Sequence, residues 1–428
     1  MTAEIAILNK MAVALAADSA VSIGSPPNLK IYNTVNKIFE LSSHAPVGIM
    51  VYGRLDFMGI PYEPLIKEYR RILGKKTFAK IDGYRSAFKE HLAKNVPYSE
   101  QDARVNVGII VNEALKEANA QIDTLVWKDI QTRGRYLKSK INSMAQSHLR
   151  TLIAELKKKP FAAGFNRKSI PANCASIVDT LVDQAFSSNN PNAGTKSLIL
   201  EYVGYLLSKR TLSDDRTGIV IAGFGDDDIF PSLTWFETDG MVDGRLKFED
   251  HPTIDIDRSG PDADVLGFAQ DDMMKSFLDG VDPAVKRYIE GLIEKSISDT
   301  ASTVIDALIT NSATASAAKL SVKNDLDRIV KDIKDSITDH VKITSANPIR
   351  DMIRAMPKQE LATLATSLIE ITSLKRKVSR ERETVGGEVD VAIISKSEGF
   401  VWIKRKHYFP SELNRRFAKR QAHLEDTP

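Results

Sequence analysis

The sequence predicts an α+β fold in which two β-sheets pack face to face and helices cover the outside, a four-layer αββα sandwich. Strand-like segments come in three batches, within residues 1–53, 217–269 and 389–403. Long stretches with helical periodicity separate these batches, from about 61 to 209 and from 273 to 373. Sheets built from separate batches of strands, with helices between them, favour one layered core with large helical insertions.

The first batch carries the clearest strand pattern. Apolar residues alternate at Ile5 and Ile7 and again at Val13 and Leu15, and Lys10 lies where a hairpin turn would fall. Period-two alternation on both sides of a turn predicts an antiparallel hairpin. Two further strands are expected at Lys37–Leu41 and Val47–Gly53, which gives four short strands in about fifty residues, with Val21–Gly24 following the second.

The later elements follow from periodicity and from turn residues. Helices are expected from Pro61 onward and over 101–121, 136–159, 196–209, 273–345 and 357–373. The Ala-, Ser- and Thr-rich stretch 301–320 is expected to be a tightly packed helix. Strands are expected at Gly218–Gly225, Ser232–Thr238, Arg245–Glu249, Asp264–Ala269, Val389–Ile394 and Gly399–Ile403.

Composition indicates a globular protein without a membrane anchor. The 428 residues carry a net charge of +3, and 43% of them are hydrophobic. The single Cys174 excludes an internal disulfide framework and suits the cytoplasm. The apolar run Met11–Ala17 is short and follows Glu4, so a signal peptide is not expected. No run reaches the ~18 apolar residues of a membrane span.

The segment Thr2–Gly24 resembles the opening of proteasome β-type subunits and of the bacterial proteasome-like peptidase that partners an ATP-driven unfoldase. These proteins are N-terminal nucleophile (Ntn) hydrolases. Their first strand begins with a processed threonine, and a hairpin leads to an aspartate in an Ala-Asp-Ser motif, which is matched without a gap by Ala17–Ser19. Their catalytic lysine opens the third strand, as Lys37 does here, and their oxyanion glycine follows the fourth strand, as Gly53 does.

Two further matches extend this resemblance along the chain. Ile221–Gly225 followed by Leu233–Phe236 resembles the central hairpin of the family, and Gly386–Ile394 resembles its late Gly-Gly strand. The resemblance implies an Ntn hydrolase core made of 1–70, 215–272 and 355–405. It leaves 71–214 and 273–354 as helical insertions and 406–428 as a basic C-terminal tail.

The sequence departs from the family pattern at two places. Where the family has Ser-Gly after a strand, this chain has Phe268 and Ala269. Where the family has an Asp and a Ser before the late glycines, the nearest candidates here are Glu383 and Thr384. Both departures concern groups that support the nucleophile, so they bear on catalysis more than on the fold.

The resemblance implies catalytic roles for Thr2, Asp18, Lys37 and Gly53. A threonine hydroxyl needs a base to take its proton, and a free α-amino group, whose ordinary pKa is near 8, is available at an N-terminal threonine. The ammonium of Lys37 would lower that pKa by like-charge repulsion, and Asp18 would hold the lysine in place. The N–H of Gly53 would stabilise the oxyanion. Met1 must be removed for this chemistry.

The expected protein is therefore a cytoplasmic threonine peptidase or amidase that needs no cofactor and no metal and that self-associates, with an unfoldase or another protein as a possible partner. A catalytically inactive proteasome-like scaffold is the first alternative. A nucleic-acid-associated protein that uses the basic tail is the second, although nucleic acid is not the expected partner. Lys30 competes with Lys37 for the lysine role, and Asp226–Asp228 is interpreted as solvated turn residues in preference to a metal site.

Overall fold

The computed structural model describes residues 3–24, 30–134, 138–257, 260–379, 385–407, 409–410, 413–414 and 416. It combines helices and strands in two compact units, which are described separately. The first unit comprises Met1–Val35, Ile256–Ile393 and Val401–Asn414, and the second comprises Asn36–Asp255, Ile394–Phe400 and Arg415–Pro428. The basic C-terminal tail expected over 406–428 falls largely outside the described residues.

A five-stranded sheet forms the centre of the first unit. Its strand order is β13 (Ala263–Ala269), β1 (Ala3–Asn9), β2 (Val13–Ala17), β14 (Asp390–Ser395) and β15 (Gly399–Lys404). β1 pairs antiparallel with both β2 and β13, which confirms the predicted hairpin. The side chain of Asn9 closes that hairpin, because its Oδ1 accepts the Met11 N–H at 2.9 Å.

Three helices pack beside this sheet. They are α7 (Asp272–Asp279), α10 (Asn347–Arg354) and α11 (Lys358–Val378). Leu361, Ala365 and Leu368 of α11 recur at helical spacing and share a buried cluster with Ile5 and Ile7 of β1. Two short strands, β3 (Val21–Ile23) and β4 (Lys30–Tyr32), pair with each other.

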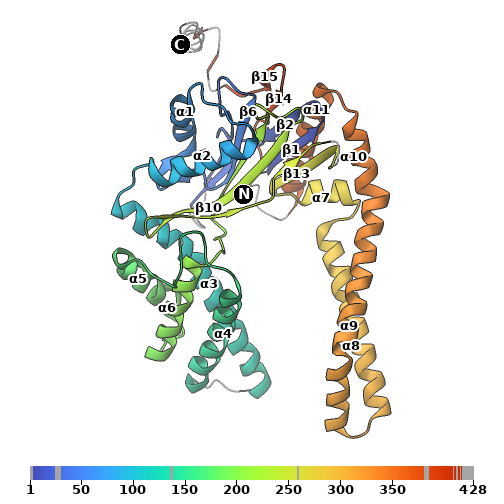
Figure 1. Cartoon of the computed structure of the whole chain (residues 1–428). Coiled ribbons are helices and arrows are strands. Elements are labelled where there is room, and N and C mark those ends of the chain that lie inside the picture. The colour runs from blue at the N-terminus through green and yellow to red at the C-terminus, as the bar shows by residue number, and fades with distance from the viewer. Residues whose placement is uncertain are drawn as a thin grey trace. The chain divides into compact units, whose positions relative to one another are not determined.

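The stretch expected to be helical over 273–345 consists of α7 followed by a helical hairpin. Figure 1 shows α8 (Pro283–Leu308) and α9 (Ser312–Val341) side by side and antiparallel, and a π-turn (η2, Lys342–Ala346) leads on to α10. Asn311 starts α9, since its Oδ1 accepts the N–H groups of Ala313 and Thr314.

The expectation that the helix over residues 301–320 is tightly packed was wrong. Ala315 is the one buried residue of this stretch, whereas Leu308 and Leu320 are 78% and 74% exposed. The reason is geometric, because a two-helix hairpin gives each helix a single neighbour and leaves its other faces to solvent.

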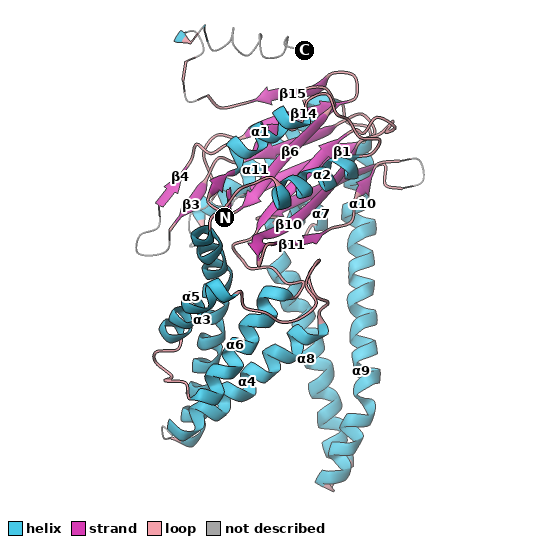
Figure 2. Ribbon diagram, turned by 60° about the vertical axis from the view of Figure 1, so that its left-hand side comes forward, coloured by secondary structure: helices cyan, strands magenta, loops and turns pink. Residues whose placement is uncertain are grey.

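The second unit is built on an antiparallel sheet. Its strand order is β11 (Arg245–Asp250), β10 (Ser232–Val242), β9 (Thr217–Gly223), β6 (Val47–Gly53) and β5 (Ile38–Glu40), and β12 (Ile254–Asp255) pairs with β10. One face packs against α1 (Tyr62–Leu73) and α2 (Ile81–Lys94), as Figure 2 shows. The small pair β7 (Asp56–Phe57) and β8 (Ile60–Pro61) precedes α1.

Four more helices of this unit have a core of their own. They are α3 (Glu100–Arg133), α4 (Lys138–Lys158), α5 (Ala175–Ala185) and α6 (Ala193–Ser208), with a short 3-10 turn (η1, Ala172–Cys174) before α5. A capping box between Ser99 and Asp102 starts α3. The sequence predicted α4 and α6 closely. It missed α2 and α5, and it ended α3 about three turns too early.

Candidate functional site

The first described residue of β1 lies against the end of β2. The Ala3 N–H donates to Asp18 Oδ1 at 3.1 Å, and the Asp18 N–H donates to the Ala3 carbonyl at 3.2 Å. Thr2 itself lies outside the described residues. The expected acid is therefore hydrogen-bonded to the residue that follows the expected nucleophile in sequence.

Backbone groups hold the Asp18 carboxylate on several sides. Besides Ala3, the N–H groups of Ala20 and Gly386 donate to its Oδ2 at 3.2 and 3.0 Å. Asp18 is 1% exposed. A carboxylate bound by three N–H donors and removed from water keeps one orientation, which is what a positioning acid requires.

The Gly386–Gly387 turn fastens this arrangement. Ser19 donates its N–H to the Gly386 carbonyl at 3.1 Å and its hydroxyl to the Glu388 carbonyl. Gly387 has a φ of +79°, and a Cβ at this position would lie 2.8 Å from the Asn33 carbonyl oxygen. Only glycine fits such a site without strain. The sequence placed these glycines on a late strand but did not link them to Asp18.

Lys37 and Gly53 belong to the second unit, at one end of the β5–β6 pair. The Val51 N–H donates to the Lys37 carbonyl at 2.9 Å, and Gly53 follows two residues later at the end of β6. Lys37 is 1% exposed, whereas its competitor Lys30 is exposed at the start of β4. Of the four candidate residues, Lys37 and Gly53 therefore share one unit, and Asp18 belongs to the other.

Gly53 has the backbone conformation of an obligatory glycine. Its φ is +79°, and a Cβ would lie 2.2 Å from the Arg216 carbonyl oxygen. The same carbonyl accepts the Arg54 N–H at 3.2 Å, and Gly53 pairs with Thr217 of β9. Any larger residue here would push β6 away from β9.

The structure shows where Phe268 and Ala269, which replace the Ser-Gly of the family pattern, lie in the sheet. Ala269 pairs with Ala3, and Phe268 pairs with Glu4, so both departing residues lie directly opposite the start of β1. Ala269 has a φ of +59°, a left-handed conformation that favours glycine. Glu383 and Thr384, the other candidates at a point of departure, lie outside the described residues.

A cavity of about 400 Å³ opens beside Asp18 in the first unit. It lies between the C-terminal half of α11 and the turn that follows Gly386. Ser373 and Glu370 of α11 line it together with Asp18 and Gly387.

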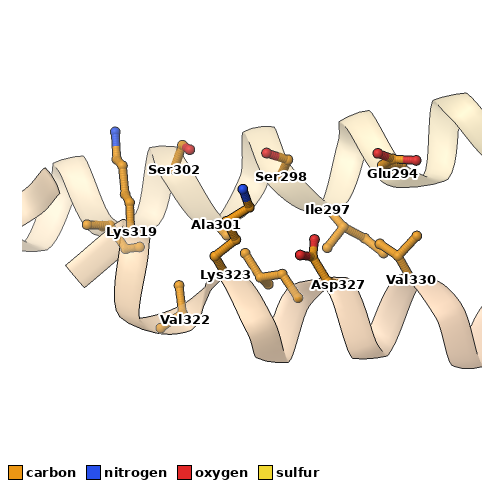
Figure 3. Close-up of a pocket in the computed structure, with 12 residues that line it drawn as sticks. Glu294, Ile297, Ser298, Ala301, Ser302, Lys319, Val322, Lys323, Asp327 and Val330 are labelled. Carbon is orange, nitrogen blue, oxygen red and sulfur yellow. The ribbon is translucent and has the colours of Figure 1, made fainter. Parts of the chain in front are cut away.

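A second cavity of about 290 Å³ lies between α8 and α9 (Figure 3). Its walls mix small and charged side chains, among them Ser298, Ser302 and Asp327. Ion pairs join the two helices, from Lys334 to Glu294 at 3.0 Å and from Lys319 to Asp306 at 2.6 Å. None of the four candidate catalytic residues lines it.

Metal ligation finds no support among the described residues, where no group of three His, Cys, Asp or Glu side chains is arranged to hold an ion. Asp228 instead accepts the Gly225 N–H at 2.9 Å and pairs with Lys80 at 2.6 Å, while Asp226 accepts the Thr77 hydroxyl. These acids belong to a turn, as expected. The Asp228 side chain is buried, however, whereas a solvated side chain was expected. None of the described helices is long and apolar enough to cross a membrane.

The sequence matches no protein-family model and no curated protein. Among solved structures, the chain is similar to a Gly-1 mutant of Anbu from Hyphomicrobium sp. strain MC1, with 9% identity and a TM-score of 0.30 over 100% of this chain and 98% of that chain. A second structure of Anbu from that organism gives 8% identity and 0.30 over 100% and 97%. Anbu, described as an ancestral beta-subunit, from Yersinia bercovieri gives 9% and 0.28 over 100% and 97%. At these TM-scores the likeness adds no weight to the residue geometry described above.

Proposed function

We propose that this chain is a threonine-type Ntn hydrolase that cleaves peptide or amide bonds through an acyl-enzyme on Thr2, once Met1 has been removed. The observation that carries the proposal is the fixed Asp18 carboxylate beside Ala3, since an acid held against the start of β1 lies next to the nucleophile that the sequence register assigns. Burial of Lys37 adds support, because a lysine is almost never fully buried unless it is paired or has a functional role.

In the proposed reaction the free amine of Thr2 accepts the hydroxyl proton, and the alkoxide attacks the scissile carbonyl. Asp18 orients Lys37, whose positive charge stabilises the deprotonated hydroxyl. The Gly53 N–H stabilises the oxyanion, and the amine returns the proton to the leaving nitrogen. Water then releases the acyl group by the same route in reverse.

The proposal includes the four-layer αββα fold, with 1–70, 215–272 and 355–405 as the core. It also includes a cytoplasmic, self-associating protein that receives substrate alone or from an unfoldase. The helical insertions 71–214 and 273–354 are then additions to a peptidase core, placed to change that assembly or to bind a partner.

Two measurements test the proposal. Intact mass of the protein from its own host should show a chain that starts at Thr2. On a fluorogenic peptide panel, Thr2→Ala should lose hydrolysis, whereas Thr2→Ser should retain part of it because the hydroxyl remains. Lys37→Met should be inactive, and Lys30→Met, which changes an exposed lysine, should match wild type. Equal hydrolysis by wild type and Thr2→Ala removes the proposed nucleophile.

A catalytically inactive scaffold is the second candidate, and Phe268 with Ala269 favours it, because a supporting serine is missing opposite the start of β1. Retention of Met1 in the native mass would favour the scaffold. The nucleic-acid alternative rests on a tail that lies mostly outside the described residues, and salt-dependent binding lost on truncation after Ile403 would support it.

A further inference from the structure

A cavity of about 500 Å³ in the second unit collects cationic side chains from three separate segments. Lys159 follows α4, Arg210 follows α6 and Arg216 precedes β9. The first two segments run side by side, since the Arg210 N–H donates to the Pro160 carbonyl at 2.9 Å and Phe161 forms an antiparallel bridge with Lys209. Backbone pairing therefore holds the segments that carry Lys159 and Arg210 next to each other.

The two carboxylates that line the cavity are already engaged. Glu237 Oε1 accepts the Arg216 Nε–H at 2.8 Å and the Tyr52 hydroxyl at 3.1 Å, while its Oε2 lies 3.3 Å from a ring nitrogen of His251. Glu249 lies 3.4 Å from Arg210 Nε. Few acceptor positions remain for a ligand that donates hydrogen bonds.

Donors remain in excess. Arg216 also donates to the Ser213 carbonyl, and Arg210 to the Asp250 carbonyl, but each guanidinium has further N–H groups. Lys159 donates to Thr211 Oγ1 at 3.1 Å, and over the described ranges no carboxylate lies within ion-pair distance of it. Among the residues that line the cavity, three cations face two carboxylates, an excess of one positive charge. A carboxylate matches this set of donors, whereas a polyanion would need a longer cationic surface.

The cavity adjoins the proposed oxyanion glycine. The carbonyl of Arg216 packs against Gly53, and the hydroxyl of Tyr52, the residue before Gly53, binds Glu237 inside the cavity. A peptide whose scissile carbonyl lay at Gly53 would have its neighbouring residues within reach of Arg216.

We propose that this cavity binds a carboxylate of the peptide substrate, either an acidic side chain near the cleaved bond or the peptide's own C-terminus. The inference rests on the proposed function and assigns a substrate class to the same site. Lys159 and Arg210 supply the selective contacts, because their donors are the least engaged. Arg216 holds Glu237 and abuts Gly53, so it also positions the backbone.

Peptide binding to the full-length Thr2→Ala protein tests this without any need for turnover. The probes are a fluorescein-labelled alanine-based octapeptide with one central Glu, its Gln counterpart, and both with a free or an amidated C-terminus. Fluorescence anisotropy should show about fivefold to tenfold tighter binding of the peptides that carry the preferred carboxylate, as expected for charge-assisted contacts. The Glu/Gln and acid/amide comparisons identify which carboxylate is bound.

Lys159→Gln and Arg210→Gln, each in the Thr2→Ala background, should remove most of this preference. Lys158→Gln is the matched control, since Lys158 is the exposed neighbour of Lys159 in sequence and pairs with Glu155. Equal affinity for all four peptides, no binding up to millimolar peptide, or a preference that survives both substitutions overturns the inference. Hydrolysis by wild type with no carboxylate preference would overturn the inference alone, whereas a preference without any hydrolysis would overturn the proposed function alone.

Discussion

The Lys247–Asp239 ion pair offers the sharpest test of how the helices α3–α6 are attached to the sheet of the second unit. Lys247 Nζ lies 2.8 Å from Asp239 Oδ2, and the two side chains are 1% and 0% exposed. Lys247 also donates to the Leu206 carbonyl in the last turn of α6 at 2.9 Å. Asp239 accepts the N–H and the hydroxyl of Ser213. One buried network therefore joins β10, β11 and α6.

Replacing Lys247 with Met should destabilise the second unit by about 3–5 kcal/mol, because the Asp239 carboxylate is left buried without its cation. The Leu206 carbonyl also loses its donor, and a buried acceptor left unsatisfied costs about 1–3 kcal/mol. The double variant Lys247→Met/Asp239→Leu should be less destabilised than the sum of the single variants, since no unpaired charge remains.

Hydrogen exchange of the β10, β11 and α6 amides is the preferred assay, because it reports local opening in a chain of two units. Exchange there should accelerate in Lys247→Met. Lys116→Met is the matched control, because Lys116 pairs with Glu113 on the surface and should contribute only about 0.2–1 kcal/mol. A loss below about 1 kcal/mol in Lys247→Met would show that the buried pair is dispensable, against the range expected for buried pairs.

Three further predictions follow from local geometry. Ala269→Gly should stabilise the first unit by about 0.5–1 kcal/mol in urea unfolding, since the left-handed strain at φ +59° outweighs the added entropy of the unfolded chain; unchanged stability would contradict it. Gly218→Ala should destabilise the second unit by about 1–3 kcal/mol, because a Cβ would lie 1.9 Å from the Tyr52 ring; a melting temperature equal to wild type would contradict it. Burial lowers the pKa of His91 beside Tyr69, so the folded state binds fewer protons than the unfolded state, and stability should fall as pH drops below about 6.5. His91→Phe should weaken that fall in acid denaturation curves, and an identical pH dependence would exclude His91 as its source.

The strands near the N-terminus were predictable because alternation and turn chemistry agree there. Ile5, Ile7, Val13 and Leu15 follow a strict period of two, and the register this implies places Asp18 beside Ala3, as the structure has it. Local pattern and tertiary position carry the same information in such a hairpin.

The sequence between α7 and α8 contains helix-stop and helix-start residues that helical periodicity does not detect. Gly280 adopts a left-handed C-cap, Asp282 caps the next helix, and Pro283 occupies its first turn. These residue types at this spacing are the ordinary stop and start signals of consecutive helices. Periodicity over 273–345 predicted helical structure but did not locate where one helix ends and the next begins.

The buried lysines could not have been predicted from the strand pattern. Lys247 lies in a short alternating strand, where a lysine is expected on the solvent face, yet it is buried because the end of α6 covers it. Lys37 likewise opens a strand and is buried. For Lys247 the covering contact comes from Leu206, 41 residues away in sequence, and no local rule contains it.

The bonds of Asp18 also decide which variants can distinguish an enzyme from a scaffold. Its carboxylate joins Ala3, Ala20 and Gly386, so an inactive homologue would keep it for the same structural reason. Asp18→Asn would place amide hydrogens against backbone N–H donors and should lower stability whether or not the protein is an enzyme. Loss of activity in Asp18→Asn is therefore weak support for catalysis, whereas loss of activity in Lys37→Met or Thr2→Ala with unchanged thermal unfolding is strong support.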